Sequence, residues 1–134
     1  MTYPWSSGEV LTAADLNASI GNSWSTPTFS AGWANFGSGL PDVRYRVSGD
    51  TLNVHGLAKR TGGSTSGGSS VIFVLPSGSR PASGYTISAT WGSSSTVNAV
   101  QRVNVFSNGE VALDSATPVT TGDFVWLNLW IPMS

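Results

Sequence analysis

The side chains able to carry out acid–base chemistry are few and scattered along the chain. There is one histidine, His55, in the middle of a predicted strand, and there are seven carboxylates. General acid–base catalysis needs a histidine or carboxylate held in a perturbing environment, whereas the neighbours of His55 are neutral and favour a surface or hydrogen-bonded role. Carboxylates such as Asp50 and Glu110 fall at predicted turns. A glycosidase pair built from two distant carboxylates stays open, but nothing selects one. We expect no catalytic residues and no enzyme activity.

Motifs for metals, nucleotides and acyl transfer are equally absent from the sequence. With one histidine and no cysteine, a zinc site is not expected, and no segment has the alternating oxygen ligands of a calcium loop. The glycine pairs at 62–63 and 67–68 lack the Gly-Lys-Ser/Thr ending and the following helix of a phosphate-binding loop. No Gly-x-Ser-x-Gly elbow joins a strand to a helix. We therefore expect no cofactor and no metal.

Aromatic side chains are the remaining candidates for binding, because Trp and Tyr offer large contact areas with few rotatable bonds. Trp91 ends a predicted strand and is followed by a Gly/Ser turn, so we treat it, with Tyr85 and Arg80, as a candidate ligand contact. The alternative is that such residues belong to the core, which is the interpretation we favour for Trp126 and Tyr45.

Short alternating segments separated by turns dominate the chain after residue 42. We predict strands at 43–47, 51–57, 71–75, 85–91, 97–106, 111–113 and 124–131, with Asn108-Gly109 as a hairpin turn in which both residues tolerate positive φ. The last strand is apolar on both faces, so both faces must be covered. Its second face carries Phe124, Trp126 and Trp130, which we predict to contact a second sheet, the N-terminal segment or another subunit.

One short helix is predicted, near the N-terminus. Thr12 is a good N-cap, Asp15 can complete a capping box, and Leu11 and Leu16 are placed as a hydrophobic staple. Leu16 and Ile20 form a narrow apolar stripe, and a helix this short needs a surface to dock on. That surface is left open between the chain's own domain, a symmetry mate and another protein.

Composition limits the class of protein. The 134 residues suit one domain with a short appendage, which we divide into an N-terminal segment, 1–26, and a β domain, 27–134. Charged residues make up 10% of the chain, the net charge is -1 and there is no basic stripe, which argues against binding to nucleic acid or anionic lipid. No apolar run approaches the ~18 residues of a membrane span, and no secretory signal is recognised. Many short strands and turns indicate an antiparallel β-sandwich, jelly roll or barrel.

Several of these segments resemble one protein family. Residues 8–18, GEVLTAADLNA, are similar to a signature near the start of many tailed-bacteriophage tail-fibre and minor tail proteins. Residues 45–57 resemble the Y-R-x-x-G-D-x-V-x-L-x-G hairpin of their C-terminal knobs, and residues 72–81 resemble I-F-x-L-P-x-G-Y-R-P. Asn108-Gly109 and the Trp-rich last strand follow in the same order. Ser79 departs from the pattern, which has Tyr there, and the long stalk of typical fibres is missing.

The resemblance implies a homotrimeric β-sandwich or jelly-roll knob on the virion, made in the host cytoplasm without a signal peptide. Its N-terminal segment would attach it to other phage structural proteins, and its knob would contact a host-surface glycan. The trimer would cover the second face of the last strand. Without a stalk the protein would be a short spike, a baseplate or tail-tip component, or a head fibre. Two alternatives remain, namely a decoration protein without a receptor and a free carbohydrate-binding module.

Overall fold

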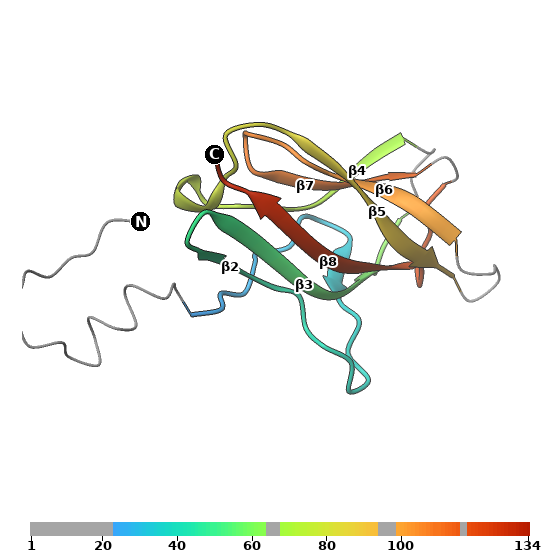
Figure 1. Ribbon diagram of the computed structural model, residues 1–134. Helices are drawn as coiled ribbons and strands as arrows, with labels where there is room; N and C mark the ends of the chain where they lie inside the picture. The colour runs from blue at the N-terminus through green and yellow to red at the C-terminus, as the bar shows by residue number, and fades with distance from the viewer. Residues whose placement is uncertain (1–22, 64–67, 94–98, 116–117) are drawn as a thin grey trace, which may run out of the picture.

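The chain is all β, as its alternating segments predict. The computed structural model describes residues 23–63, 68–93, 99–115 and 118–134, and within these ranges it contains strands, turns and one short 3₁₀ helix but no α-helix (Figure 1). The strands are β1 (Trp33–Asn35), β2 (Arg44–Ser48), β3 (Thr51–Arg60), β4 (Gly68–Val74), β5 (Tyr85–Gly92), β6 (Ala99–Val105), β7 (Glu110–Ser115) and β8 (Phe124–Pro132). The 3₁₀ helix, η1, is Ser77–Ser79.

All eight strands belong to one antiparallel sheet in the order β1-β3-β8-β5-β6-β7-β4, with β2 paired to β3. The link between its two halves is short, because β5 and β8 pair only at Trp91↔Val125 and Gly92↔Phe124 and then separate. Figure 1 shows β8 and β5 crossing at an angle, with β2 and β3 on one side and β6 and β7 on the other. The predicted sandwich or jelly roll is therefore not confirmed: hydrogen bonds run from one half to the other, and the sheet is barrel-like.

The segment before β1 joins the two ends of this sheet. Ser25 exchanges backbone hydrogen bonds with Tyr45 on β2, at 2.8 and 2.9 Å, and Phe29 forms a bridge with Phe73 on β4. Side chains also connect β2 with β4, because the rings of Tyr45 and Phe73 stack with their centroids 6.4 Å apart. We name residues 25–30 the seam segment. Because it contacts both β2 and β4, the sheet is nearly closed and its edges are protected from pairing with other chains.

The core lies inside the curved sheet. On β8 the residues at alternate positions, Val125, Leu127, Leu129 and Ile131, are all buried, as the sequence pattern predicts. Ala89 and Trp91 of β5 and Leu52 and Val54 of β3 point to the same interior. Removing these side chains from water provides the main driving force for folding.

Two local predictions need correction. The hairpin between β6 and β7 is present, but its turn is closed by a 2.9 Å hydrogen bond from the Gly109 amide to the Phe106 carbonyl, and of its residues only Gly109 has a positive φ, +95°. This is a type I turn followed by a glycine rather than a two-residue turn with two left-handed positions. Trp33–Asn35, which lies before the first predicted strand, forms β1 because β3 is long enough to pair with it at its far end.

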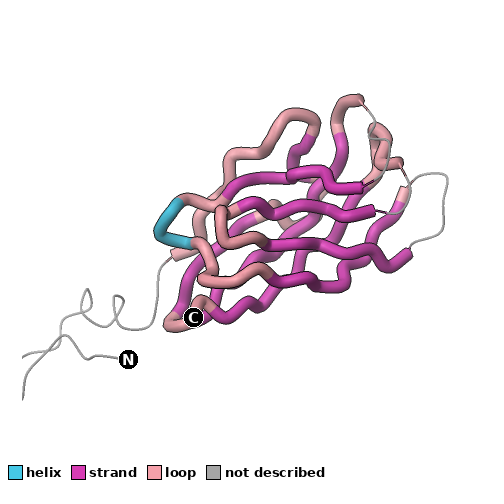
Figure 2. Tube along the Cα trace, turned by 90° about the horizontal axis from the view of Figure 1, so that it is seen from above, coloured by secondary structure: helices cyan, strands magenta, loops and turns pink. Residues whose placement is uncertain are grey.

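The predicted helix, with Leu11, Thr12, Asp15, Leu16 and Ile20, lies outside the described residues. The β domain extends at least to Ser25, two positions before the predicted boundary at residue 27, since Ser25 already pairs with β2. At the other end of the chain, Met133 bonds to Asp50 and Ala82, so the C-terminus lies beside the β2–β3 turn and close to η1 (Figure 2). No helix in the described part of the chain is long and apolar enough to cross a membrane.

Candidate ligand-binding groove

The outer face of β2, β3 and β8 carries a compact set of polar and aromatic side chains. Side chains two positions apart on a strand share a face, and the strand registers align these ones across the sheet. Two rows result: Arg44, His55 and Asn128 in one, and Arg46, Asn53 and Trp130 in the other. The intervening row, Tyr45, Val54 and Leu129, faces the interior.

Trp24 packs between the two arginines at the β2 side. The guanidinium carbon of Arg44 lies 4.5 Å from the centroid of the indole, and that of Arg46 lies 4.5 Å from it as well. Such cation–π contacts contribute about 0.5–1 kcal/mol each at exposed positions. Trp24 is held there because Ser25, the next residue, is hydrogen-bonded to Tyr45, which lies between the two arginines on β2.

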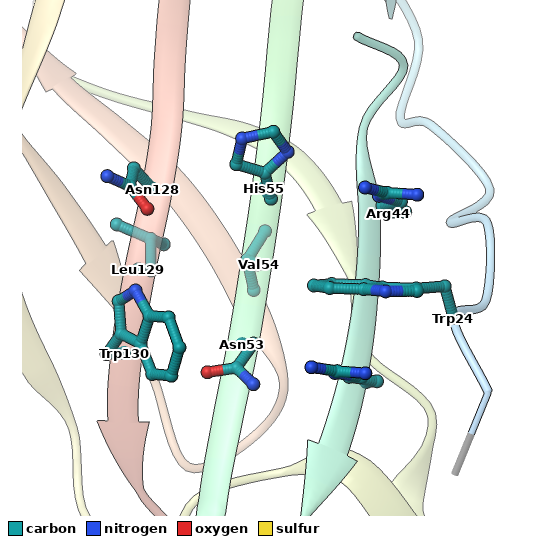
Figure 3. A pocket seen from close by; sticks show the side chains of 9 residues that line it. Trp24, Arg44, Asn53, Val54, His55, Asn128, Leu129 and Trp130 are labelled. Carbon is teal, nitrogen blue, oxygen red and sulfur yellow. The ribbon is translucent and has the colours of Figure 1, made fainter.

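These residues line a groove with a volume of about 170 Å³. Figure 3 shows Trp24 and Trp130 at its opposite sides, with Asn53 and His55 on the strand between them and Asn128 beside His55. The Trp130 side chain is 68% exposed, an unusual state for so large an apolar group. The groove thus combines two aromatic walls with a polar floor.

Three polar atoms in the groove are buried without a hydrogen-bond partner among the described residues: Asn53 Oδ1, His55 Nδ1 and Arg46 Nε. Asn53 as a whole is only 4% exposed. Leaving such an atom unpaired costs roughly 1–3 kcal/mol, so buried polar groups almost always have partners. All three atoms are shielded from solvent, so a molecule in the groove reaches them only after neighbouring side chains shift.

A second, more polar pocket adjoins the groove and shares His55 and Asn128 with it. Its other residues are Ser88, Ala89 and Thr90 on β5 and Trp126 on β8. The pocket lies where β5 and β8 separate after their two paired residues. Together the two depressions form a continuous surface across four strands, lined by side chains from segments far apart in the sequence.

Charges in the groove are of one sign. Its lining contains Arg44 and Arg46, and no carboxylate lines it or the second pocket. In the part of the chain that the structure describes, no three His, Cys, Asp or Glu side chains come together as a metal site would require.

The predicted ligand contacts lie elsewhere. Trp91 is 5% exposed and is part of the core. Tyr85 is half-buried and packs against the core, and Arg80 donates from Nε to the Leu75 carbonyl at 2.9 Å. None of the three lines the groove or the second pocket. Trp91 lies two positions after Ala89 on β5, so the two side chains share the inward face of the strand, and both are buried.

The predicted interface residues of β8 have three different environments. Phe124 is half-buried against Phe36, with ring centroids 5.5 Å apart, so the chain itself covers this part of the second face. Trp126 is half-buried and lines the second pocket. Trp130 is left exposed at the groove. A subunit contact through these residues remains a prediction.

We did not identify Trp24, Arg44, Arg46, Asn53 or Asn128 as site residues from the sequence. The predicted hairpin implies part of this arrangement, because a tight turn at 48–51 pairs Arg44 with His55 and Arg46 with Asn53. The pairing of β3 with β8, which adds Asn128 and Trp130, has no local signal.

Comparison with known proteins gives a structural match only. No protein-family model and no curated protein matches the sequence. The structure is similar to the crystal structure of the head domain of phage bIL170, one of the receptor-binding domains of lactococcal phages. The TM-score is 0.64 and the sequence identity is 14%, and the match covers 84% of this chain and 98% of that chain. The chain therefore has the fold of a phage receptor-binding head domain.

Proposed function

We propose that this protein is the knob of a bacteriophage fibre or spike, a non-enzymatic virion component that contacts a glycan on the host cell surface. The observation that carries the proposal is the fold shared with a phage receptor-binding head domain over 98% of that domain. Since one fold can serve many functions, the site must support the same conclusion. The groove supports it, because exposed Trp130 suits the apolar face of a sugar, and the polar side chains of Asn53 and Asn128 suit its hydroxyl groups.

Two further parts of the proposal concern assembly. The residues before Trp24 attach the knob to other phage structural proteins, which the similarity of residues 8–18 to the start of tail-fibre proteins supports. The knob is a homotrimer, as its resemblance to the knobs of tail-fibre proteins implies.

The test compares adsorption of phage particles carrying the unaltered protein with adsorption of particles carrying Asn53→Leu, Asn128→Ala or Trp130→Ala. Each groove variant should incorporate normally and adsorb at least about fivefold more slowly, since hydrogen bonds and aromatic contacts to a ligand are each worth about 1 kcal/mol or more. Ser69→Ala, at an exposed position on β4, serves as the matched control. Normal adsorption by all three groove variants would contradict a receptor role for the groove.

The same particles test the attachment role. Deletion of residues 1–22 ends before Trp24 and the seam segment, so the β domain should keep its fold while the protein fails to join particles. Incorporation of the truncated protein would contradict attachment through this segment. If the full-length protein incorporates but no groove variant changes adsorption, a decoration protein without a receptor becomes the better description.

A further inference from the structure

Positive charge is concentrated in the groove although the protein as a whole is slightly acidic. Arg44 and Arg46 are two of only six Lys and Arg residues in the chain, whose net charge is -1. The ion pair found among the described residues joins Arg102 to Asp114, at 2.8 Å, and involves neither groove arginine. Two cations held on one face without a paired carboxylate generate a local field that attracts anions.

The way Trp24 packs leaves the arginines able to bind an anion. A cation–π contact uses the flat face of a guanidinium, whereas carboxylates and phosphates are bound by the N–H donors around its edge. The faces of Arg44 and Arg46 are turned to the indole of Trp24. Arg44 is exposed and Arg46 is half-buried, and neither forms an ion pair within the described part of the chain. The indole therefore fixes both guanidinium groups while their terminal nitrogens stay available.

The remainder of the groove suits an uncharged, hydroxyl-rich group. Asn53 lies directly between Arg46 and Trp130 in the register of the three strands, and its Oδ1 lacks a donor. An amide oxygen accepts from a hydroxyl and repels an anion, so this buried atom suits a ring hydroxyl that reaches it as neighbouring side chains shift. Beyond it, the exposed indole of Trp130 offers a flat apolar surface. A ligand that fits all these groups has an acidic substituent at one end and a sugar ring at the other.

We propose that the groove selects an acidic saccharide, whose phosphate or carboxylate binds Arg44 and Arg46 while its ring lies over Asn53 and against Trp130. This inference rests on the proposed function and specifies the class of glycan. The arginines supply charge and edge donors, Asn53 supplies an acceptor for a ring hydroxyl, and Trp130 supplies the stacking surface.

Titration of the full-length protein with small probes tests the inference directly. Glucose, glucose 1-phosphate, glucuronic acid and inorganic phosphate are compared by calorimetry or by NMR chemical-shift changes. At least one of the two acidic sugars should bind about tenfold or more tightly than glucose, as expected for a charge-assisted hydrogen bond. The comparison of glucose 1-phosphate with glucuronic acid decides between phosphate and carboxylate. Inorganic phosphate should bind more weakly than glucose 1-phosphate, because it lacks the ring.

Salt provides a test that needs no variant. Raising the ionic strength from about 0.05 M to 0.5 M shortens the screening length several-fold, so it should weaken binding of the acidic sugar while leaving that of glucose nearly unchanged. Equal affinity for glucose and both acidic sugars, with no salt dependence, would overturn the inference.

Variants then assign the effect to the arginines. The double variant Arg44→Gln/Arg46→Gln should bind the acidic sugar no more tightly than glucose and should retain its affinity for glucose, which shows that the groove is intact. Arg102→Gln, on the exposed side of β6, removes one positive charge outside the groove and should behave like the unaltered protein. If the double variant unfolds because Trp24 loses its contacts, Arg46→Lys keeps the charge but removes the edge donors and should lower the preference for the acid.

Three outcomes separate the inference from the proposed function. In the first outcome, an acidic sugar binds tightly and the double variant Arg44→Gln/Arg46→Gln binds it equally tightly. The anion would then bind elsewhere on the protein, which overturns the inference. An acidic peptide that competes as strongly as the acidic sugar would show that the groove recognises charge alone, which also overturns it. If Trp130→Ala still abolishes adsorption in either case, the receptor role stands and only the acidic nature of the ligand is wrong.

Discussion

The indole nitrogen of Trp33 donates a 3.1 Å hydrogen bond to the hydroxyl of Ser70, and this bond joins the two ends of the sheet. Trp33 belongs to β1 at one end of the strand order, and Ser70 belongs to β4 at the other. Both side chains are buried. The bond therefore reports whether the barrel-like sheet is closed.

Replacement of Ser70 by Ala should lower the free energy of unfolding by about 1–3 kcal/mol, because the Trp33 donor is left buried without a partner. Urea denaturation measures the change, and Ser69→Ala, at an exposed neighbouring position, should alter it by less than about 0.5 kcal/mol. The pair Trp33→Phe and Ser70→Ala should together cost less than the sum of the two single changes. Additive effects would mean that the bond contributes nothing to closure.

Gly56 is the position in β3 where a side chain is least acceptable. Its φ is +132°, and a Cβ atom there would collide with the backbone of Asp42 and Val43, which crosses over the strand. Gly56→Ala should cost about 3 kcal/mol or more, since backbone strain and steric overlap act together. Thermal unfolding measures the loss. Gly49→Ala, at another positive φ but with no atom near the added methyl group, is the control and should cost about 1–2 kcal/mol.

Trp130→Ala should reduce ligand binding without lowering stability. The side chain is 68% exposed, so its removal exposes little new apolar surface within the chain. Val100→Ala removes an even more exposed side chain on β6 and should affect neither property. Urea denaturation and adsorption of particles are measured on the same variants. A loss of stability in Trp130→Ala above about 1 kcal/mol would indicate that Trp130 acts as a structural residue of the monomer.

Light scattering should give a mass three times the 13.9 kDa of the chain. A monomer at all concentrations would remove the trimer from the proposed function and leave the groove on a single chain.

Local sequence pattern was sufficient for the strands themselves. Alternation with period two is a property of neighbouring residues, so the segments around 44–48, 51–60, 85–92 and 124–132 were predicted with ends wrong by only one to three residues. The same alternation correctly placed Val125, Leu127, Leu129 and Ile131 on a buried face. Together with low charge and frequent turns, it determined an all-β fold.

Tertiary structure decided which strands are neighbours, and through that the site. Trp91 and Trp130 look alike in sequence, each near the end of an alternating strand. One enters the core, and the other remains exposed, because the strand pairing sets which face of β5 and of β8 turns inward. Pairing over more than 70 residues, as between Asn53 and Trp130, leaves no trace in either segment.

Hence the sequence by itself determined the elements, their apolar faces and the absence of recognisable catalytic motifs. The order β3-β8-β5, the closure by the seam segment and the packing of Trp24 between Arg44 and Arg46 came only from the tertiary structure. The physical reason is the sequence distance between the residues involved. The alternation of polar and apolar side chains can be recognised in neighbouring residues, whereas strand order depends on packing between residues that lie far apart in the sequence.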